Sequence, residues 1–317
     1  MAYKKLAVCV IGIYACFLTW GVTQERVSKT PYDGKKFHYF VFLNIIQSFT
    51  ATIIAYLYIK LKGARIESLT RERVGQYLYL ATLACCAPLF GYASLDYLDY
   101  PTVILGKSCK LVPVVLMNFI LYRKVFPLKK YLVVLLITIG VSGFMLLHPK
   151  KSKGDNEASL YGILLLTINL LIDGAINSKQ DQMFHTHKVQ GTTMMLIMNS
   201  FSFVLMTLYL IVNPYTTELT DAIAFCQLHP KIITDLFLFG IAGALGQCFI
   251  FYTLESFGSL VLVTVTVTRK MFSILLSVFW FGHVLSVGQW TSVGLVFFAI
   301  GWEAMVKKHK SNSSKQN

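Results

Sequence analysis

The chain has 317 residues, of which 55% are hydrophobic and only 14% are charged, and its formal net charge is +14. Soluble domains contain about 25% charged residues, so the composition excludes an ordinary soluble domain and indicates a polytopic membrane protein. The excess of positive charge is typical of basic cytosolic loops and of cations within the membrane, rather than of nucleic-acid binding. Most of the seven cysteines lie in apolar stretches, so we interpret them as small buried side chains and not as a disulfide framework.

Ten apolar stretches follow one another along the chain, each near the length of about 20 residues that a membrane-crossing helix needs. The first continues too far to be a cleavable signal peptide, so we expect it to remain as a span. The predicted spans cover residues 4–23, 37–59, 75–95, 100–122, 129–148, 160–178, 192–212, 233–254, 258–281 and 287–306.

The distribution of Lys and Arg between the loops predicts that both termini are cytosolic. In that orientation 17 of these residues face the cytosol and 8 face the opposite side, as the positive-inside rule requires. The glycosylation sequon at Asn312 would then face the cytosol and stay bare, and a glycan found there would contradict the orientation.

A polar break at residues 149–159 separates five spans from five. The two halves are weakly alike, and because five is odd the second half enters the membrane upside down relative to the first. We therefore predict an all-α polytopic membrane protein with two inverted five-helix repeats, and a substrate site near the membrane midplane between the repeats. The predicted organisation is 1–148 for the first repeat, 149–159 for the polar loop, 160–306 for the second repeat and 307–317 for a basic cytosolic tail.

Four basic residues lie near the centres of two predicted spans, namely Lys107, Lys110, Arg269 and Lys270. A charge at such a depth costs roughly 2.5–3.5 kcal/mol on insertion scales, and neither span holds an acid that could pair with it. Lysine offers a point charge and arginine a fork of donors, so the four side chains could enclose a diphosphate from two sides. The alternatives are that they pair with Asp173, Glu25 or Glu303, or that they reach lipid headgroups.

A few other polar residues in the spans are candidates for contacts with the rest of a substrate. Asp173 could orient a cation or contact a sugar hydroxyl, or it could form a structural ion pair. Asn199 and Gln247 could bind a base or a sugar, or they could join helices. Glu25 could lie at a gate or at a solvated helix end, and Glu25 and Asp173 are the candidates if protons take part.

Motifs for catalysis or for a metal or cofactor are absent from the sequence. It contains no nucleophile elbow, no cluster of metal ligands and no phosphate-binding glycine loop. We therefore predict a protein that is not an enzyme and that uses no cofactor.

Several motifs are distributed along nearly the whole chain: Gly12–Trp20 with Gln24-Glu25, Tyr100-Pro101-Thr102 with Gly106–Lys110, Asp173-Gly174 with Gln180-Asp181, Ala244–Phe251, Phe257–Leu260 and Thr266–Phe272. By these motifs the sequence resembles the nucleotide-sugar transporters of the drug/metabolite transporter superfamily. Within them it is most similar to the B group of solute carrier family 35, in its fungal UDP-galactose transporter branch.

The resemblance implies ten helices, cytosolic termini and residence in the endoplasmic reticulum membrane. It implies transport of UDP-galactose, or another nucleotide-sugar, from the cytosol into the endoplasmic reticulum or Golgi lumen, in support of lumenal folding and glycosylation. We expect exchange for a nucleotide such as UMP, with membrane lipids as the other partners. Two alternatives stay open: an ATP/ADP exchanger, as some relatives in this branch are described, and a quality-control membrane protein without transport.

Overall fold

The structure is a computed structural model of the 317-residue chain. It describes all residues except 1, 33–34, 36, 64–69, 95–96, 99–102, 104–106, 108–109, 124, 148–155, 188, 260, 270–271, 273–285 and 314–317. The described part is helical apart from short connections and one isolated β-bridge between Tyr32 and Lys35.

Two compact units are formed, each from segments that are far apart in the sequence. Unit 1 comprises residues 1–86 and 179–262, and unit 2 comprises residues 87–178 and 263–317. The chain passes from one unit to the other within α3 (Arg71–Ala93), within α7 (Asn156–His187) and between Leu262 and Val263. The other helices of unit 1 are α1 (Ala2–Lys29), α2 (Phe40–Leu61), α8 (Gly191–Val212), α9 (Glu218–Leu228) and α10 (Lys231–Phe257); those of unit 2 are α5 (Leu111–Tyr122), α6 (Leu128–Leu146) and α12 (Val287–Ser313).

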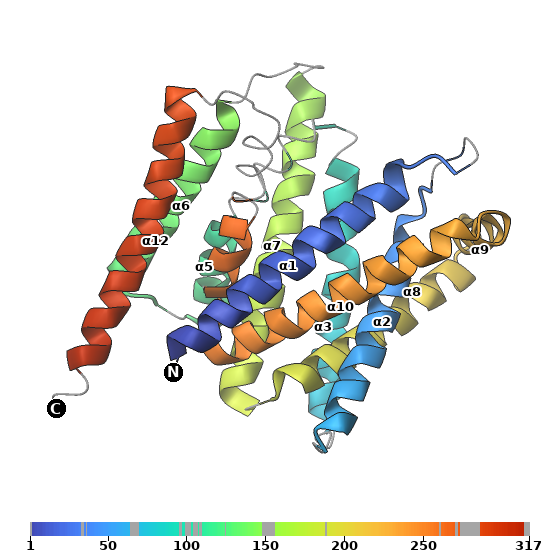
Figure 1. The fold of residues 1–317 in the computed structure, drawn as a ribbon, viewed down its shortest axis with the longest axis horizontal. Helices are drawn as coiled ribbons and strands as arrows, with labels where there is room; N and C mark the ends of the chain where they lie inside the picture. Colours follow the sequence, from blue (N-terminus) through green and yellow to red (C-terminus); the bar gives the residue numbers. More distant parts are fainter. Residues whose placement is uncertain are drawn as a thin grey trace. The chain divides into compact units, whose positions relative to one another are not determined.

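Unit 1 is built around α10, which packs along α1 and α2, while α2 also packs along α8. Figure 1 shows α1 and α10 side by side. Small residues on α10 permit this close packing, as is typical of membrane helices. A Cβ atom on Gly246 would lie 2.7 Å from the ring of Phe17, and one on Gly240 would lie 2.6 Å from Thr50 Oγ1.

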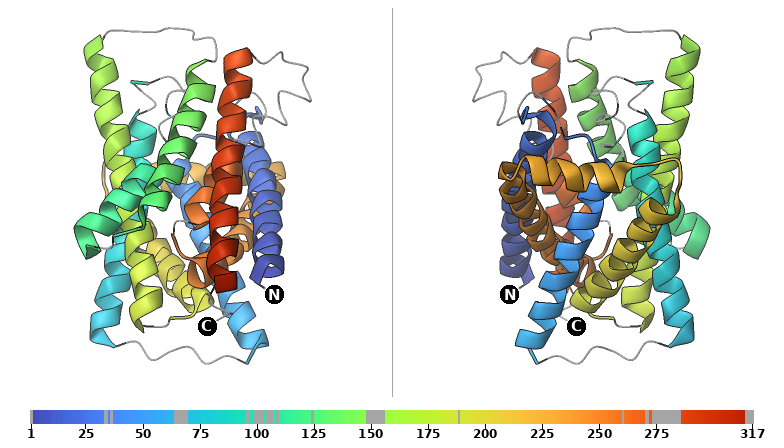
Figure 2. Two further views of the ribbon diagram at one scale, coloured as in Figure 1. Left: turned by 90° about the vertical axis from the view of Figure 1, so that its left-hand side faces the viewer. Right: turned by 90° about the vertical axis from the view of Figure 1, so that its right-hand side faces the viewer.

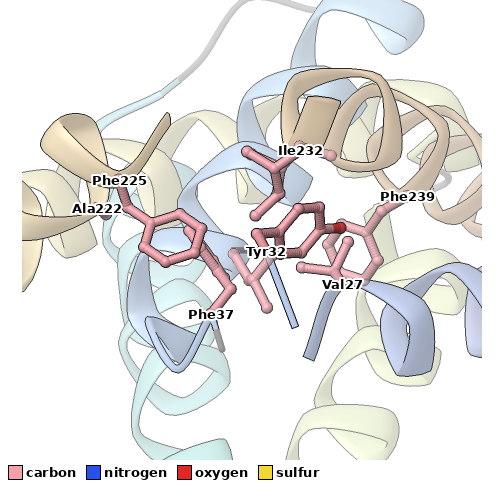
Figure 3. Close-up of a cluster of buried hydrophobic side chains, with 9 residues drawn as sticks. Val27, Tyr32, Phe37, Ala222, Phe225, Ile232 and Phe239 are labelled. Carbon is pink, nitrogen blue, oxygen red and sulfur yellow. The ribbon is translucent and has the colours of Figure 1, made fainter. Parts of the chain in front are cut away.

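A cluster of buried side chains joins the connection after α1 to α9 and α10, and Figure 3 shows Tyr32 surrounded by its members. The Phe37 ring meets Phe225 edge-on, with their centroids 5.4 Å apart. Helix α9 lies between the seventh and eighth predicted spans, where the sequence predicts a loop. It has only 11 residues, so it is too short to cross a membrane, and Ala222 and Phe225 bury one side of it.

Unit 2 contains the antiparallel helices α6 and α12, which lie side by side in Figures 1 and 2. Glycines on α6 again permit the approach: a Cβ atom on Gly140 would lie 2.6 Å from Val296 Cγ2, and one on Gly143 would lie 2.8 Å from Ser292 Oγ. Helix α5 packs against α6.

The predicted spans agree with the helices that the structure describes. Six helical segments are long and apolar enough to cross a membrane, namely Lys4–Gln24, Phe40–Leu61, Arg71–Gly91, Leu160–His187, Gly191–Val212 and Lys231–Phe257. Three shorter apolar helices, Val112–Tyr122, Tyr131–Gly140 and Val287–Ala299, fall in the fourth, fifth and tenth predicted spans. Of the ninth predicted span, residues 261–269 are described as helix. The prediction of a helical membrane protein with many apolar helices is therefore confirmed.

Several helices continue beyond the predicted ends of their spans. Helix α1 ends at Lys29 and α12 at Ser313, and the longest extension is that of the sixth span. The sixth span was expected to end at Ser178, where a polar run begins, but α7 continues to His187. The polar side chains of this run have partners within unit 1. Gln180 Nε2 bonds to Met198 Sδ at 3.1 Å, and Asp181 Oδ1 accepts a hydrogen bond from the Ser259 backbone N–H at 3.1 Å. Because these groups are satisfied by packing, a stretch with the composition of a loop can remain helical and buried.

Each compact unit draws helices from both predicted five-helix repeats. The units are groups of helices that pack together, whereas the repeats are divisions of the sequence, so the repeats stay a prediction.

Candidate functional site

Helix α7 carries a row of polar side chains through its apolar sequence. Asn169, Asp173 and Asn177 are four residues apart, so they lie on one face of the helix. Leu166 and Leu170 beside this row are buried in a small apolar cluster with Leu98 and Val103, which lie between α3 and α5. This polar face of α7 organises the candidate site of unit 2.

Lys110 is bonded to the middle member of the row. Its Nζ donates to Asp173 Oδ2 at 3.1 Å, and the two side chains are 26% and 31% exposed. One of the alternatives stated above, that Lys110 pairs with Asp173, is therefore what the structure shows. Its counter-charge comes from a helix 63 residues further along the chain, because a lone cation in an apolar span is costly. Since both groups remain partly open, the pair is still accessible to another ion.

Lys107 lies close to this pair and to Asn169. Its Nζ is 3.2 Å from the position that a Cβ atom on Gly91 would occupy, and Asn169 Oδ1 is 3.4 Å from the same point. Lys107 also interacts electrostatically with Asp173 and Lys110. We call Lys107, Lys110, Asn169 and Asp173 the α7 cluster. The absence of a side chain at Gly91 leaves room for the ammonium and the amide to come together.

The start of α5 is held against α7 directly beside the cluster. A Cβ atom on Gly174 would lie 2.8 Å from the Pro113 backbone oxygen, so only glycine permits this approach. One turn further along each helix, Asn118 Nδ2 donates to Ser178 Oγ at 2.8 Å and to the Val114 backbone oxygen at 2.9 Å. These contacts fix the position of Lys110 relative to Asp173.

The remaining charged candidates are placed less fully. Arg269 is half-buried at the end of the helical residues 261–269 and belongs to unit 2, like the α7 cluster. Lys270 lies outside the described residues. Glu25 lies on α1 in unit 1, and its side chain is outside the described part. The structure thus brings together three of the predicted site residues, Lys107, Lys110 and Asp173.

The two predicted amide residues, Asn199 and Gln247, meet in unit 1. Asn199 Nδ2 donates to Gln247 Oε1 at 2.8 Å and to the Met195 backbone oxygen at 2.8 Å. This bond joins α8 to α10, which was one of the two interpretations of these residues. A contact with substrate stays a prediction for both.

Sequence reasoning missed Asn169 and Gly91. Asn169 is one helical turn before Asp173, and that spacing of four was the signal that could have found it. Gly91 carried no comparable signal, because its importance depends on which side chains fold against it.

Comparisons with known proteins give the class of this protein. Residues 5–307 match the UAA transporter family. The chain belongs to this family. It is a multi-pass membrane protein of the nucleotide-sugar transporter class, and it is a transporter and not an enzyme. Membership implies the drug/metabolite transporter fold.

Three relatives show how far the similarity extends, each named UDP-galactose transporter homolog 1. The Yarrowia lipolytica protein is 46% identical, with 96% of this chain and 88% of that protein covered. The Schizosaccharomyces pombe protein is 43% identical, with 98% and 97% covered. The Aspergillus fumigatus protein is 42% identical, with 98% and 87% covered. A solved crystal structure with 10% identity superposes with a TM-score of 0.69 over 96% of this chain and 98% of the other, which shows a shared fold.

Proposed function

We propose that this protein exchanges UDP-galactose for a nucleotide such as UMP across the endoplasmic reticulum membrane. UDP-galactose moves from the cytosol into the lumen, where it supports glycosylation and protein folding. The names of the relatives support the choice of substrate, and the ten-helix inverted-repeat plan with cytosolic termini is part of the proposal. The packing of α2 on α8 and of α6 on α12 supports the repeats. Helices α2 and α8 are the second predicted spans of the two halves, and α6 and α12 are the fifth.

The observation that carries the proposal is the partly open ion pair of Lys110 and Asp173 with a second cation, Lys107, beside it. A phosphate group offers several charged acceptor oxygens, and its hydrogen bonds to lysine are charge-assisted. It can replace the Asp173 carboxylate as the partner of Lys110 and be bonded by Lys107 at the same time. Among the described residues, no carboxylate lies within ion-pair distance of Lys107.

Exchange follows from the charge of the α7 cluster. Two lysines and one aspartate leave a net positive charge, which is costly in a closed site of low dielectric. A bound nucleotide neutralises that charge, so the loaded carrier changes orientation more easily than the empty one. A returning nucleotide is therefore expected to accelerate uptake.

Counterflow into proteoliposomes tests the proposal directly. Purified protein is reconstituted with UMP or ADP inside, and labelled UDP-galactose and labelled ATP are offered outside in parallel. UDP-galactose uptake that depends on internal UMP is the expected result. ATP uptake that depends on internal ADP would replace the proposed role with adenine nucleotide exchange, and no uptake of either by folded protein would contradict transport of both substrates.

A further inference from the structure

Asn169 contains a buried hydrogen-bond acceptor without a partner. The residue is 3% exposed, and its Nδ2 donates to the Ala87 backbone oxygen at 2.5 Å. Its Oδ1 is buried and has no hydrogen-bond partner among the described residues. Buried polar atoms are nearly always bonded, so an orphan acceptor in a transporter span requires an explanation.

The orientation of this amide is fixed by its surroundings. Ala87 offers a carbonyl oxygen, which can only accept, so the nitrogen of Asn169 must face it. The oxygen then turns to the space over Gly91, where Lys107 Nζ also lies. The α7 cluster therefore presents an acceptor and a cationic donor next to each other.

Few chemical groups satisfy both of these neighbours. An ionised phosphate oxygen only accepts, so it would suit Lys107 but be repelled by Asn169 Oδ1. An amino group of a base donates to Oδ1 but offers nothing to an ammonium ion. A hydroxyl group does both, since it donates its proton to Oδ1 and accepts from Nζ on its oxygen.

The place of Asn169 agrees with a sugar hydroxyl. Asn169 is four residues from Asp173 on α7, which is a rise of about 6 Å along the helix. If phosphate binds at Lys110, the next group along α7 is the one attached to the phosphate. In a nucleotide-sugar the diphosphate carries a ribose on one side and the hexose on the other, and both offer hydroxyl groups. We assign the hexose to Asn169, and UMP, which has a ribose but no hexose, tests this choice below.

We infer that Asn169 is a sugar-recognising residue, whose Oδ1 accepts a hydrogen bond from one hydroxyl of the transported hexose while Lys107 donates to the same hydroxyl oxygen. This inference rests on the proposed function. It assigns to the α7 cluster the discrimination between a nucleotide-sugar and a nucleotide without sugar, because only the former satisfies Oδ1.

The test compares substrate analogues on the wild-type protein and on Asn169→Ala. The probes are UDP-galactose, its four monodeoxyfluoro analogues and UMP, as competitors of labelled UDP-galactose counterflow. For the wild type, one fluoro analogue is expected to bind about tenfold or more weakly than the parent, since fluorine cannot donate a proton. For Asn169→Ala, the affinity for UDP-galactose is expected to fall to the affinity of the wild type for that analogue. UMP is expected to compete as strongly as it does with the wild type.

Asn118→Ala is the matched control, because Asn118 is an equally buried asparagine of unit 2 whose side chain is bonded to Ser178 and Val114. It is expected to change the affinity for all probes by one common factor. If every fluoro analogue binds wild-type protein like the parent, or if Asn169→Ala weakens UMP as much as UDP-galactose, Asn169 has only a structural role and its orphan oxygen binds a water molecule. The same experiment separates the two proposals. If the wild type takes up UDP-galactose, the proposed function stands, whatever the result for Asn169. If the wild type does not take it up, the proposed function is contradicted, and the role of Asn169 fails with it.

Discussion

At the scale of single residues, the bond between Lys110 and Asp173 is the feature on which the proposed mechanism depends. In the proposed mechanism, Asp173 neutralises Lys110 while the site is empty, and a phosphate of the substrate takes over that role. A carboxylate at this position thus lowers the cost of the empty site and also competes with the substrate. The proposed mechanism therefore requires both the lysine and the aspartate, for different steps of one cycle.

Replacing Lys110 tests this assignment. Lys110→Ala removes one charge-assisted bond to phosphate and leaves Asp173 without its partner, so we expect at least a tenfold loss of UDP-galactose counterflow, about 1.5–3 kcal/mol. The matched control is Lys62→Ala, since Lys62 lies outside the spans and its ammonium group lies over the Tyr58 ring, 4.7 Å from the ring centroid. Equal activity of the two variants, at equal amounts of folded protein, would rule out a role of Lys110 in binding.

A second residue prediction concerns Tyr32, outside the spans. Tyr32 is buried and its hydroxyl donates to Asp235 Oδ2 at 2.9 Å. Burial, followed by the neighbouring Asp235 carboxylate, raises the pKa of Tyr32 from 10.0 to about 12. The folded protein therefore keeps a proton that the unfolded chain releases at lower pH. The stability that this contributes is fully present below pH 10.0 and is lost as the pH rises through about 12.

The measurement is the unfolding temperature of detergent-purified protein between neutral pH and about pH 12. Tyr32→Phe is expected to be less stable than the wild type at neutral pH, and this difference should shrink above pH 10.0. Tyr215→Phe is the control, because Tyr215 is 96% exposed. A Tyr32→Phe curve parallel to the wild type over the whole range would contradict the assignment.

At the scale of helices, α7 is the element that positions the candidate site. Three of its side chains bond to other segments. Asn169 bonds to Ala87 at the end of α3, Asp173 bonds to Lys110, and Ser178 bonds to Asn118 of α5. The contacts with Lys110 and with α5 require the short distance between α5 and α7 that Gly174 permits. The geometry of the cluster therefore depends on a residue that has no polar side chain.

Gly174→Ala is expected to destabilise the protein by about 1–3 kcal/mol, because the new methyl group would meet backbone atoms of Pro113 that cannot turn away. Moving α5 outward also lengthens the bond between Lys110 and Asp173, so counterflow should fall with the unfolding temperature. Gly294→Ala is the matched control, since no atom lies within 4 Å of its Cβ position. The two variants behaving alike in both assays would show that the approach of α5 is not required.

At the scale of the whole molecule, each compact unit combines helices from both halves of the sequence. Neither half of the chain therefore makes a complete unit, which suits a transporter whose halves must stay together during exchange. The orientation of the whole chain in the membrane is determined by its basic loops.

Engineered glycosylation acceptor sites test this orientation. A site inserted into residues 64–69 is expected to stay bare in eukaryotic cells, because the basic residues around it predict a cytosolic loop. A site inserted into residues 149–155 is expected to receive a glycan, because the proposed orientation places that loop in the lumen. The electrophoretic shift removed by glycosidase treatment is the measurement, and the reverse pattern would overturn the orientation.

The sequence by itself determined the apolar helices, the membrane class and the positions of the cations within the predicted spans. Length and apolar composition suffice for a span, since a hydrocarbon core imposes one condition on every helix that crosses it. The family followed from motifs spread over the whole chain. The α7 extension and α9 were missed, because a polar run such as Gln180-Asp181 is helical only when distant groups satisfy it.

Only the tertiary structure decided which partners those residues have. Lys110 looked unpaired along the chain and is bonded to Asp173, and Asn169 became a candidate only because its oxygen lies unbonded beside Lys107. Hydrophobic length is a local property of the chain, whereas a hydrogen bond between helices depends on how segments far apart in the sequence pack. The sequence therefore fixes where the charges lie along the spans, and packing decides which of them remain available to a substrate.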